Sequence, residues 1–351
     1  MANTSSPQNR DSHRSLTRRS FGVLALGSFS ALALAACGSS NSSDSNASAS
    51  SASTSAKPAP SALPSGMGST AGDGEFPRTV KHFRGETKIE SAPKSVVILS
   101  TGQLDDVLAL GLVPIGAATA NDADLVPEYL KTKFSDKSAE LDKIAKVGKR
   151  TEPDLGAIAN LHPDLILINN TNKKEEVYES LSKIAPTVVT EGTGHNWKQD
   201  FLMVASALGS LSKAEEMLKD YEDKAKKLGE KAGKEKTFSF LYAAGDRTRV
   251  YAKSSFVGSI CEDASLSRPA AQQEGKTSID LSSENLDQAD GDYLFYGVQG
   301  GDESKLTSET LWESLKAVKE KHAHKVDSDM FYLNAGITAA LGVIEEIDKN
   351  I

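Results

Sequence analysis

The sequence predicts an α/β protein of two lobes, each built around a parallel sheet, joined by one long helix. Short apolar runs alternate with helical stretches between residues 96 and 189, and the same alternation begins again at residue 237. The strongest helical pattern of the chain lies between the two series. Continuous apolar strands that alternate with helices are typical of a parallel sheet covered on both faces. The chain is long enough after residue 75 to bury two cores.

The first series of elements forms the N-terminal lobe, which we assign to residues 76–209. Strands are expected at residues 96–99, 114–118, 165–168 and 187–189. Helices are expected at residues 103–110, 155–161 and 173–184. Gly111 follows the first of these helices and is expected to end it, because glycine readily adopts the left-handed conformation found after a helix.

The helix between the two series is expected at residues 210–233. One face is apolar and carries Ala214, Leu218, Tyr221, Ala225, Leu228 and Ala232. Ser212 and Glu215 have the spacing of a capping box, and Gly233 stands where a helix C-terminus favours glycine. At 1.5 Å per residue the helix is about 30 Å long, enough to connect two lobes. The same periodicity also fits an ordinary surface helix within one lobe.

The second series forms the C-terminal lobe, which we assign to residues 234–351. Strands are expected at residues 238–242 and 293–296, and helices at residues 256–264, 311–318 and 335–348. Ligands of open α/β sheets bind beyond the carboxyl ends of the strands. We therefore expect a ligand site between the strand ends of the two lobes.

The N-terminal segment has the pattern of an export signal. Arg18 and Arg19 precede an apolar run at residues 23–36 that is too short to span a bilayer and ends at Cys37. Residues 1–36 resemble a bacterial lipoprotein signal peptide, in which Cys37 is acylated, and the paired arginines resemble a twin-arginine signal. Residues 37–75 are rich in Ser and Ala, so we expect a lipid-anchored, disordered linker there.

The composition excludes several classes of function. The chain has 40 Lys and Arg against 48 Asp and Glu, and removal of residues 1–36 makes it more acidic, which argues against a nucleic-acid partner. With Cys37 assigned to the lipid, Cys261 has no partner for an intramolecular disulfide. The sequence contains no nucleophile elbow, phosphate loop or His-Glu-x-x-His pair, so we do not expect an enzyme, including a hydrolase that uses Asp122 or His195.

Several short motifs occur in an order and spacing that resemble a known family. They lie at residues 96–100, 108–116, 152–155, 161–166, 254–258, 266–269, 283–286 and 311–318. In this order they resemble the iron-siderophore and cobalamin binding lipoproteins of ATP-binding-cassette (ABC) importers, over residues 76–351. The resemblance implies the class III substrate-binding fold, with two Rossmann-like lobes bridged by one long helix.

The resemblance also implies a function and partners. The protein would capture a ferric siderophore between its lobes at the extracytoplasmic face of the cell membrane and deliver it to an ABC permease. It would need no cofactor and would bind no metal directly through its own side chains. We expect a monomer that reaches the membrane through its lipid anchor.

The candidate ligand-binding residues follow from strand-end positions and side-chain chemistry. Aromatic side chains offer rigid walls, and guanidinium groups can hydrogen-bond the oxygens around a chelated ferric ion. The candidates are Trp197, Tyr242, Tyr251, Tyr296, Arg247, Arg249 and Arg268, together with His195, which could reach a metal directly. Catecholate binders of the family tend to carry an arginine where this chain has Ser255, which favours a hydroxamate or mixed, less charged chelate.

Docking on the permease uses one exposed glutamate per lobe in this family. Glu284 matches in the C-terminal lobe, at the start of a helix whose dipole favours an anion. In the N-terminal lobe Gly156 stands at the matching position. Glu152 is therefore the candidate there, with Asp154 as the alternative.

Other ligands and roles stay open at the level of sequence. Haem is the nearest alternative, with His195 and a tyrosine as axial ligands, followed by cobalamin. A free Zn²⁺ or Mn²⁺ ion would need converging His and carboxylate ligands. The fold would also suit a surface receptor or sensor that does not take part in transport.

Overall fold

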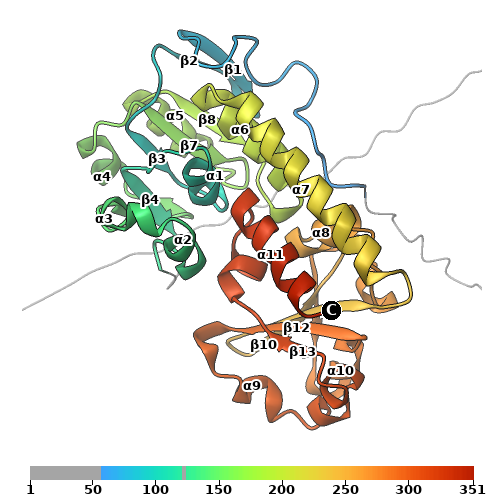
Figure 1. The fold of residues 1–351 in the computed structure, drawn as a ribbon. Coiled ribbons are helices and arrows are strands. Elements are labelled where there is room, and N and C mark those ends of the chain that lie inside the picture. Colours follow the sequence, from blue (N-terminus) through green and yellow to red (C-terminus); the bar gives the residue numbers. More distant parts are fainter. Residues whose placement is uncertain (1–56, 121–123) are drawn as a thin grey trace, which may run out of the picture. The chain divides into compact units, whose positions relative to one another are not determined.

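Two separate sheets organise the protein in this computed structural model, which describes residues 57–120 and 124–351 (Figure 1). The sheet of the N-terminal lobe has six strands in the order β6-β5-β4-β3-β7-β8. These strands are β3 (Val96–Ile98), β4 (Gly116–Thr119), β5 (Ala145–Lys149), β6 (Glu152–Pro153), β7 (Leu165–Asn169) and β8 (Thr187–Thr190). All neighbouring pairs are parallel except β5 and β6. This order is that of a doubly wound sheet, whose direction of winding changes between β3 and β7.

Helices cover both faces of this sheet, as continuous apolar strands require. They are α1 (Gln103–Ala109), α2 (Glu128–Lys133), α3 (Ser138–Leu141), α4 (Leu155–Asn160), α5 (Glu175–Ile184) and α6 (Trp197–Leu208). A hairpin of β1 (Arg78–His82) and β2 (Gly85–Ile89) precedes them. The predicted strands and helices of this lobe are present within a few residues of their expected bounds. The hairpin, β5, β6, α2, α3 and α6 are additional.

The sheet of the C-terminal lobe is mixed, with five strands in the order β11-β10-β9-β12-β13. They are β9 (Phe238–Ala244), β10 (Arg247–Tyr251), β11 (Ser278–Leu281), β12 (Tyr293–Val298) and β13 (Ala323–Lys325). Strands β9, β12 and β13 are parallel, whereas β10 and β11 are antiparallel to their neighbours. The α-helices of this lobe are α8 (Phe256–Asp263), α9 (Ser304–Thr307), α10 (Lys316–Lys319) and α11 (Ile337–Lys349).

The helix expected at residues 311–318 is broken in the structure. A short 3₁₀ turn at Trp312–Ser314 is followed by α10, because Leu315 between them is extended, with φ −59° and ψ 137°. The carboxylate of Asp290 accepts hydrogen bonds from the backbone N–H groups of Lys316 (2.7 Å) and Ala317 (3.1 Å). This acceptor caps α10 as a separate helix, which local sequence periodicity does not reveal.

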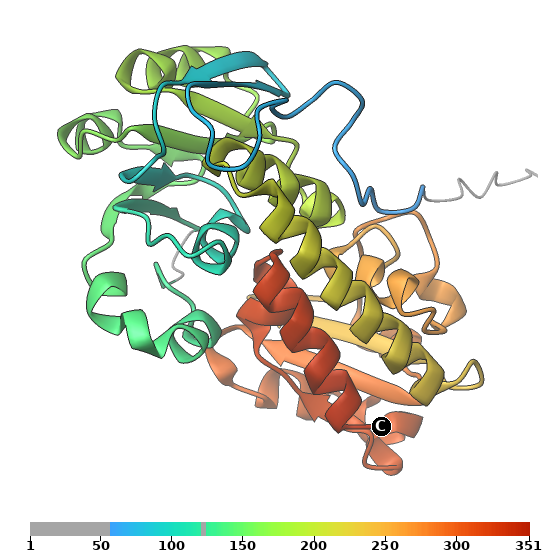
Figure 2. The ribbon, with the colours of Figure 1, turned by 45° about the horizontal axis from the view of Figure 1, so that its top comes forward.

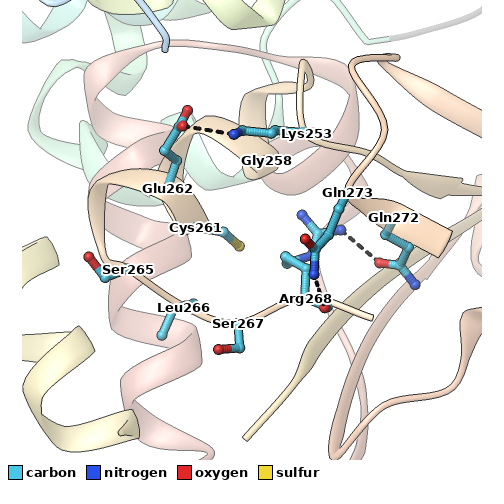
Figure 3. A pocket seen from close by; sticks show the side chains of 10 residues that line it. All are labelled: Lys253, Gly258, Cys261, Glu262, Ser265, Leu266, Ser267, Arg268, Gln272 and Gln273. Carbon is cyan, nitrogen blue, oxygen red and sulfur yellow. Dashed lines mark hydrogen bonds and ion pairs between the residues drawn. The ribbon is translucent and has the colours of Figure 1, made fainter. Parts of the chain in front are cut away.

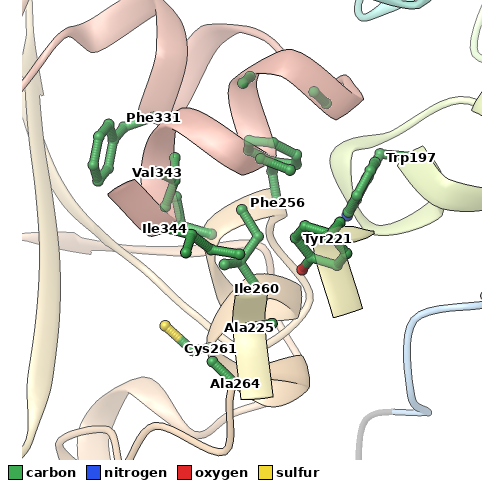
Figure 4. Packing of buried hydrophobic residues seen from close by; sticks show 14 of the residues in the cluster. Trp197, Tyr221, Ala225, Phe256, Ile260, Cys261, Ala264, Phe331, Val343 and Ile344 are labelled. Carbon is green, nitrogen blue, oxygen red and sulfur yellow. The ribbon is translucent and has the colours of Figure 1, made fainter. Parts of the chain in front are cut away.

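The long helix α7 (Leu211–Ala232) lies beside α6, α8 and α11 (Figures 1 and 2). Its buried residues belong to the predicted apolar face: Ala214, Leu218, Tyr221, Ala225 and Leu228. They pack into one apolar cluster with Trp197 of α6, Ile260 of α8 and Ile344 of α11 (Figure 4). Helix α7 thus shares a core with elements of both lobes.

The start of α7 is capped by a residue far away in the sequence. The carboxylate of Asp73 accepts hydrogen bonds from the N–H groups of Leu211 (2.8 Å) and Ser212 (2.9 Å). Ser210 occupies the N-cap position and makes no side-chain capping bond. The predicted capping box of Ser212 and Glu215 is therefore replaced by a cap from the preceding segment.

The expected disordered linker is ordered over its last part. Residues 57–75 are described, and Leu63 packs against the buried clusters of both lobes. Gly68 forms an antiparallel bridge with Lys81 of β1, and the N–H of Ser69 donates to Ser206 Oγ (2.8 Å). A few side chains and backbone groups of this polar segment contact the two lobes and hold it in place. The average composition of the segment does not reveal these individual contacts.

The expected signal peptide, Cys37 and residues 37–56 of the linker lie outside the described residues. In the part of the chain that the structure describes, no helix combines the length and the apolar character needed to cross a bilayer.

Candidate functional site

A pocket of about 520 Å³ lies where the strand ends of the two sheets face each other. From the N-terminal lobe it is lined by residues at and after β3, β4 and β5, including Ala118, Thr119 and Arg150. From the C-terminal lobe it is lined by residues at β9, β10 and β12, and by residues 328–334. We call it the interlobe pocket. Its position agrees with the rule that α/β sheets bind ligands beyond the carboxyl ends of their strands.

Two arginines from opposite lobes line the interlobe pocket, Arg150 after β5 and Arg249 on β10. The Nη1 of Arg150 donates to Thr101 Oγ1 (2.7 Å). The Nε atoms of both arginines are buried and have no hydrogen-bond partner among the described residues. Burial lowers the pKa of Arg150. The guanidinium group of arginine nevertheless stays charged in proteins. Half-buried cations whose buried Nε donors are unpaired favour a ligand rich in anionic oxygens.

An aromatic group positions Arg249. Its guanidinium carbon lies 5.7 Å from the ring centroid of Tyr242 and 5.9 Å from that of Tyr251, within range of cation–π attraction. Tyr242 lines the pocket and stacks on Tyr332, with 5.2 Å between ring centroids. Burial raises the pKa of Tyr242, so its phenol is neutral and serves as a wall and hydrogen-bonding group.

Two acidic residues also line the interlobe pocket, Asp124 and Asp329. Burial raises the pKa of Asp329, and the neighbouring Asp327 and Asp124 raise it further. Two carboxyl groups beside two guanidinium groups leave the pocket lining with little formal net charge. Such a lining fits a chelate of low charge better than one with several negative charges.

A second hollow of about 450 Å³ shares Arg150 with the interlobe pocket. It is lined by Thr101 after β3, by Thr171 after β7, and by Lys173 and Lys174. These residues follow the two strands between which the N-terminal sheet changes its winding direction. This hollow is basic and polar, unlike the interlobe pocket.

Of the candidate ligand residues, the structure brings Tyr242 and Arg249 together in the interlobe pocket. Arg247 instead lies at the tip of the β9–β10 hairpin, where its Nη2 pairs with Asp280 (2.9 Å) on the surface. Tyr251 is buried behind Tyr242, and its hydroxyl donates to the carbonyl of Tyr332 (3.3 Å). The strand expected at residues 238–242 extends to Ala244, and the chain then folds back as β10, of which Arg249 lines the interlobe pocket.

The other candidates occupy different parts of the structure. Tyr296 donates to Glu303 Oε2 (2.9 Å) and packs edge-on against Trp312. Arg268 lies in a separate pocket of the C-terminal lobe. Neither residue lines the interlobe pocket, which corrects the expectation that they contact its ligand.

Trp197 is a core residue and does not form a wall of the pocket. It is 1% exposed, packs edge-on against Tyr221 and Phe256, and donates from Nε1 to Ser259 Oγ (3.1 Å) (Figure 4). The strand end at residue 190 is followed by a short turn and then α6, which begins at Trp197 and directs it inward. The amphipathic ring suits a core as well as a binding site, so sequence alone favours neither.

His195 lies in the 3₁₀ turn Gly194–Asn196, and it does not line the interlobe pocket. Its Nδ1 is buried without a partner among the described residues. Within residues 57–120 and 124–351, no group of three or more His, Cys, Asp or Glu side chains has the geometry to hold a metal ion.

Sequence reasoning missed Arg150, because it missed the strand that precedes it. Only Val147 is fully buried in β5, so the strand lacks the continuous apolar run of its neighbours. The remaining signal in the sequence is its position, because Arg150 lies two residues before the motif at residues 152–155.

The candidate docking residues are on the surface. Glu284 is exposed in the 3₁₀ segment Ser283–Ala289, and Glu152 is exposed in β6. Gly156 is exposed in α4, whose N-cap Asp154 accepts from the N–H of Ala157 (2.9 Å). Both docking assignments stay predictions.

Comparison with known proteins agrees with this architecture. Residues 96–330 match the periplasmic binding protein family model. The probable siderophore-binding lipoprotein YfiY of Bacillus subtilis is 34% identical over 289 residues, which cover 77% of this chain and 86% of the relative. The petrobactin-binding protein YclQ of B. subtilis is 30% identical over 293 residues, covering 78% and 88%.

Solved structures show the same fold. The SirA protein of Staphylococcus aureus in complex with staphyloferrin B superposes with a TM-score of 0.66 and 28% identity, covering 78% of this chain and 97% of SirA. The crystal structure of B. subtilis YclQ superposes with a TM-score of 0.64 and 27% identity, covering 78% and 97%. Together with the family match, these similarities show that the chain belongs to the periplasmic binding protein family, as its motifs predicted.

Proposed function

We propose that this protein is an extracytoplasmic, lipid-anchored binding protein that captures a ferric siderophore in the interlobe pocket and delivers it to an ABC permease. The observation that carries the proposal is the convergence of Arg150 and Arg249, from opposite lobes, on one pocket with unpaired buried donors. The relative YfiY, described as a probable siderophore-binding lipoprotein, supports the same ligand class. The protein would act by binding alone, without catalysis and without a cofactor.

The charge of the pocket supports a hydroxamate or mixed chelate. Asp124 and Asp329 offset the two arginines of the interlobe pocket. Ser255, which stands where catecholate binders of the family tend to carry arginine, is 1% exposed and caps α8 through a hydrogen bond from the N–H of Gly258 (2.9 Å). A ferric tris-catecholate carries three negative charges, and this lining does not offset its desolvation.

The adjoining basic hollow supports the mixed type in particular. Lys173 and Lys174 line it beside Arg150. A chelate with a pendant carboxylate could place its iron centre in the interlobe pocket and its carboxylate in this hollow. Charge-assisted hydrogen bonds from lysine and arginine to a carboxylate are among the stronger polar contacts in proteins.

The proposed delivery step rests on two surface glutamates and on the anchor. Glu284 and Glu152 would each contact the permease. Cys37 would carry the lipid after export, by the twin-arginine route, and residues 37–56 would connect it to the ordered segment at residue 57. The protein would thus stay on the outer face of the membrane.

Calorimetric titration of the full-length protein in detergent tests the ligand class. The titrants are ferrioxamine, ferrichrome, a ferric citrate-hydroxamate chelate, a ferric tris-catecholate, haem and cobalamin. We expect saturable binding of a hydroxamate or mixed chelate. Replacing Arg249 by Met should weaken that binding about 10- to 100-fold, because a charge-assisted hydrogen bond contributes roughly 1.5–3 kcal/mol.

A neighbouring arginine provides the matched control. Arg247→Met removes the same group two residues away, where it is 55% exposed and pairs with Asp280. Its effect on affinity should be less than about threefold, since exposed ion pairs contribute little. Equal effects of the two substitutions, or no binding of any ferric chelate, would contradict the proposal.

A further inference from the structure

The C-terminal lobe contains a second pocket of about 380 Å³, which shares no lining residue with the interlobe pocket. It lies between the last turn of α8 and the segment that leads from residue 265 to the 3₁₀ turn Ala270–Gln272 (Figure 3). Its walls include Cys261 and Glu262 of α8, and Ser267, Arg268 and Gln273 of the following segment. We call it the Arg268 pocket.

Arg268 is almost completely enclosed, with 9% of its surface exposed. Its Nη2 donates to the carbonyl of Tyr251 and to Gln272 Oε1 (2.7 Å), and its guanidinium carbon lies 4.9 Å from the ring centroid of Phe240. Nε and Nη1 have no hydrogen-bond partner among the described residues. Of the three guanidinium nitrogens, Nη2 therefore donates hydrogen bonds, whereas Nε and Nη1 have no acceptor.

No ion pair within the described part of the chain includes Arg268. Burial of a cation without a counter-charge is costly, and proteins normally compensate it with a carboxylate or a bound anion. The carboxylate that lines this pocket, Glu262, is paired through Oε1 with Lys253 Nζ (3.2 Å), and its Oε2 is buried without a hydrogen-bond partner among the described residues. Neither oxygen of Glu262 pairs with Arg268, so among the described side chains the guanidinium makes no ion pair.

The thiol of Cys261 does not supply that charge either. Its sulfur points toward the guanidinium of Arg268 (Figure 3). Burial raises the pKa of Cys261, which keeps the thiol neutral near pH 7, although Arg268 acts in the opposite direction. A neutral thiol beside an unpaired guanidinium leaves the site cationic.

We propose that the Arg268 pocket binds a small oxyanion, with the free side of the Arg268 guanidinium as its main contact. Gln273 also lines the pocket, and its amide has a second N–H besides the one that it donates to the carbonyl of Arg268. Inorganic phosphate, sulfate and a short carboxylate share the required chemistry. The site is independent of the ferric ligand, because the two pockets are lined by different residues.

Titration of the full-length protein in chloride buffer with inorganic phosphate, sulfate, acetate or citrate, each in a separate experiment, tests this site. We expect saturable binding of one anion per chain and a melting temperature that rises with the logarithm of its concentration, as linkage requires. The anion that binds most tightly shows whether the site prefers phosphate, sulfate or a carboxylate. Binding should persist in the Arg249→Met protein, which distinguishes this site from the interlobe pocket.

Gln273→Glu is the decisive variant, because Gln273 is exposed and its Nε2 donates to the carbonyl of Arg268 (3.0 Å). A carboxylate there should act as a built-in counter-ion, weaken binding of the free anion at least tenfold, and raise the melting temperature without added anion. Gln288→Glu makes the same charge change at an exposed position outside the pocket. It should neither weaken anion binding nor raise the melting temperature. Absence of saturable binding, or equal binding by the wild type and Gln273→Glu, would overturn the proposal.

Discussion

The carboxylate of Asp105 on α1 accepts a hydrogen bond of 2.8 Å from the backbone N–H of Thr338 at the start of α11. The same carboxylate accepts from the N–H of Ala339 (2.9 Å) and from the hydroxyl of Tyr129 (3.0 Å). A side chain of the N-terminal lobe thus caps a helix of the C-terminal lobe. Gly336 permits this approach, because a Cβ atom there would lie 2.5 Å from Cβ of Asp105.

Replacement of Asp105 by Ala should lower the free energy of unfolding by about 2–4 kcal/mol. The substitution leaves two buried backbone donors and the partly buried hydroxyl of Tyr129 without an acceptor. Each unpaired buried group costs about 1–3 kcal/mol, and removal of a buried charge offsets part of this cost. Chemical denaturation measures the loss. Asp154→Ala, which removes the exposed N-cap of α4, is the control and should cost about 1 kcal/mol. Equal losses would argue against the interlobe cap.

Asp200 should make stability depend on pH. Burial raises its pKa to about 7, although the N–H groups of Glu191 (2.8 Å) and Gly192 (2.7 Å) act in the opposite direction. The protonated form is therefore favoured in the folded state. Its contribution is fully present below pH 3.8, the value for an unperturbed carboxyl, and is lost as the pH rises to about 7.

Asp200→Asn should flatten the decrease in unfolding free energy between pH 4 and pH 7. Each unit of pKa difference corresponds to about 1.4 kcal/mol, so the effect should reach roughly 3–4 kcal/mol across this range. Urea denaturation at successive pH values measures it. Asp136→Asn removes the same group from an exposed site and serves as the control. Parallel curves for wild type and Asp200→Asn would contradict the assignment.

Asp73→Ala should lower the free energy of unfolding by about 1 kcal/mol, because it removes the acceptor for the Leu211 and Ser212 N–H groups at the start of α7. Ser210→Ala should have little effect, since the Ser210 side chain makes no capping bond. Thermal denaturation of both variants gives the comparison. A larger loss for Ser210→Ala would show that the cap is local after all.

Gly229→Ala should destabilise the protein, although alanine is the better helix former by about 1 kcal/mol. A Cβ atom at this position of α7 would lie 2.0 Å from the carbonyl oxygen of Ala264, so α7 and the end of α8 would have to move apart. Gly156→Ala in α4 is the control, because its Cβ would meet only Asp154 Oδ1 at 3.4 Å. The melting temperature should fall for the first variant and stay level or rise for the second.

Glu284→Arg should lower uptake of the ferric ligand but leave its affinity unchanged, because the proposed docking glutamate lies on the surface, outside the interlobe pocket. Uptake of radiolabelled iron by cells that carry the permease, together with calorimetry of the purified protein, separates the two effects. Glu216→Arg, an equal charge change on the exposed face of α7, should alter neither. Loss of affinity in step with uptake would refute the docking role.

The sequence by itself determined the α/β class, the two series of strands and helices, and the long helix between them. These features are local: apolar runs of β-branched residues specify buried strands, and the period of Ala214, Leu218 and Tyr221 specifies one buried face of α7. The ordered motifs also identified the family. Helix α6 and the β9–β10 hairpin were not predicted, because the local sequence of each is compatible with more than one secondary structure.

Only the tertiary structure decided which polar and aromatic side chains meet. Arg249 reaches the interlobe pocket, whereas Arg247, on the same strand, pairs with Asp280 on the surface. Trp197 is buried in the core, and Arg150 joins Arg249 from the other lobe. Such placements depend on contacts between residues far apart in the chain, such as the capping of α11 by Asp105. Local propensity and periodicity carry no information about those partners.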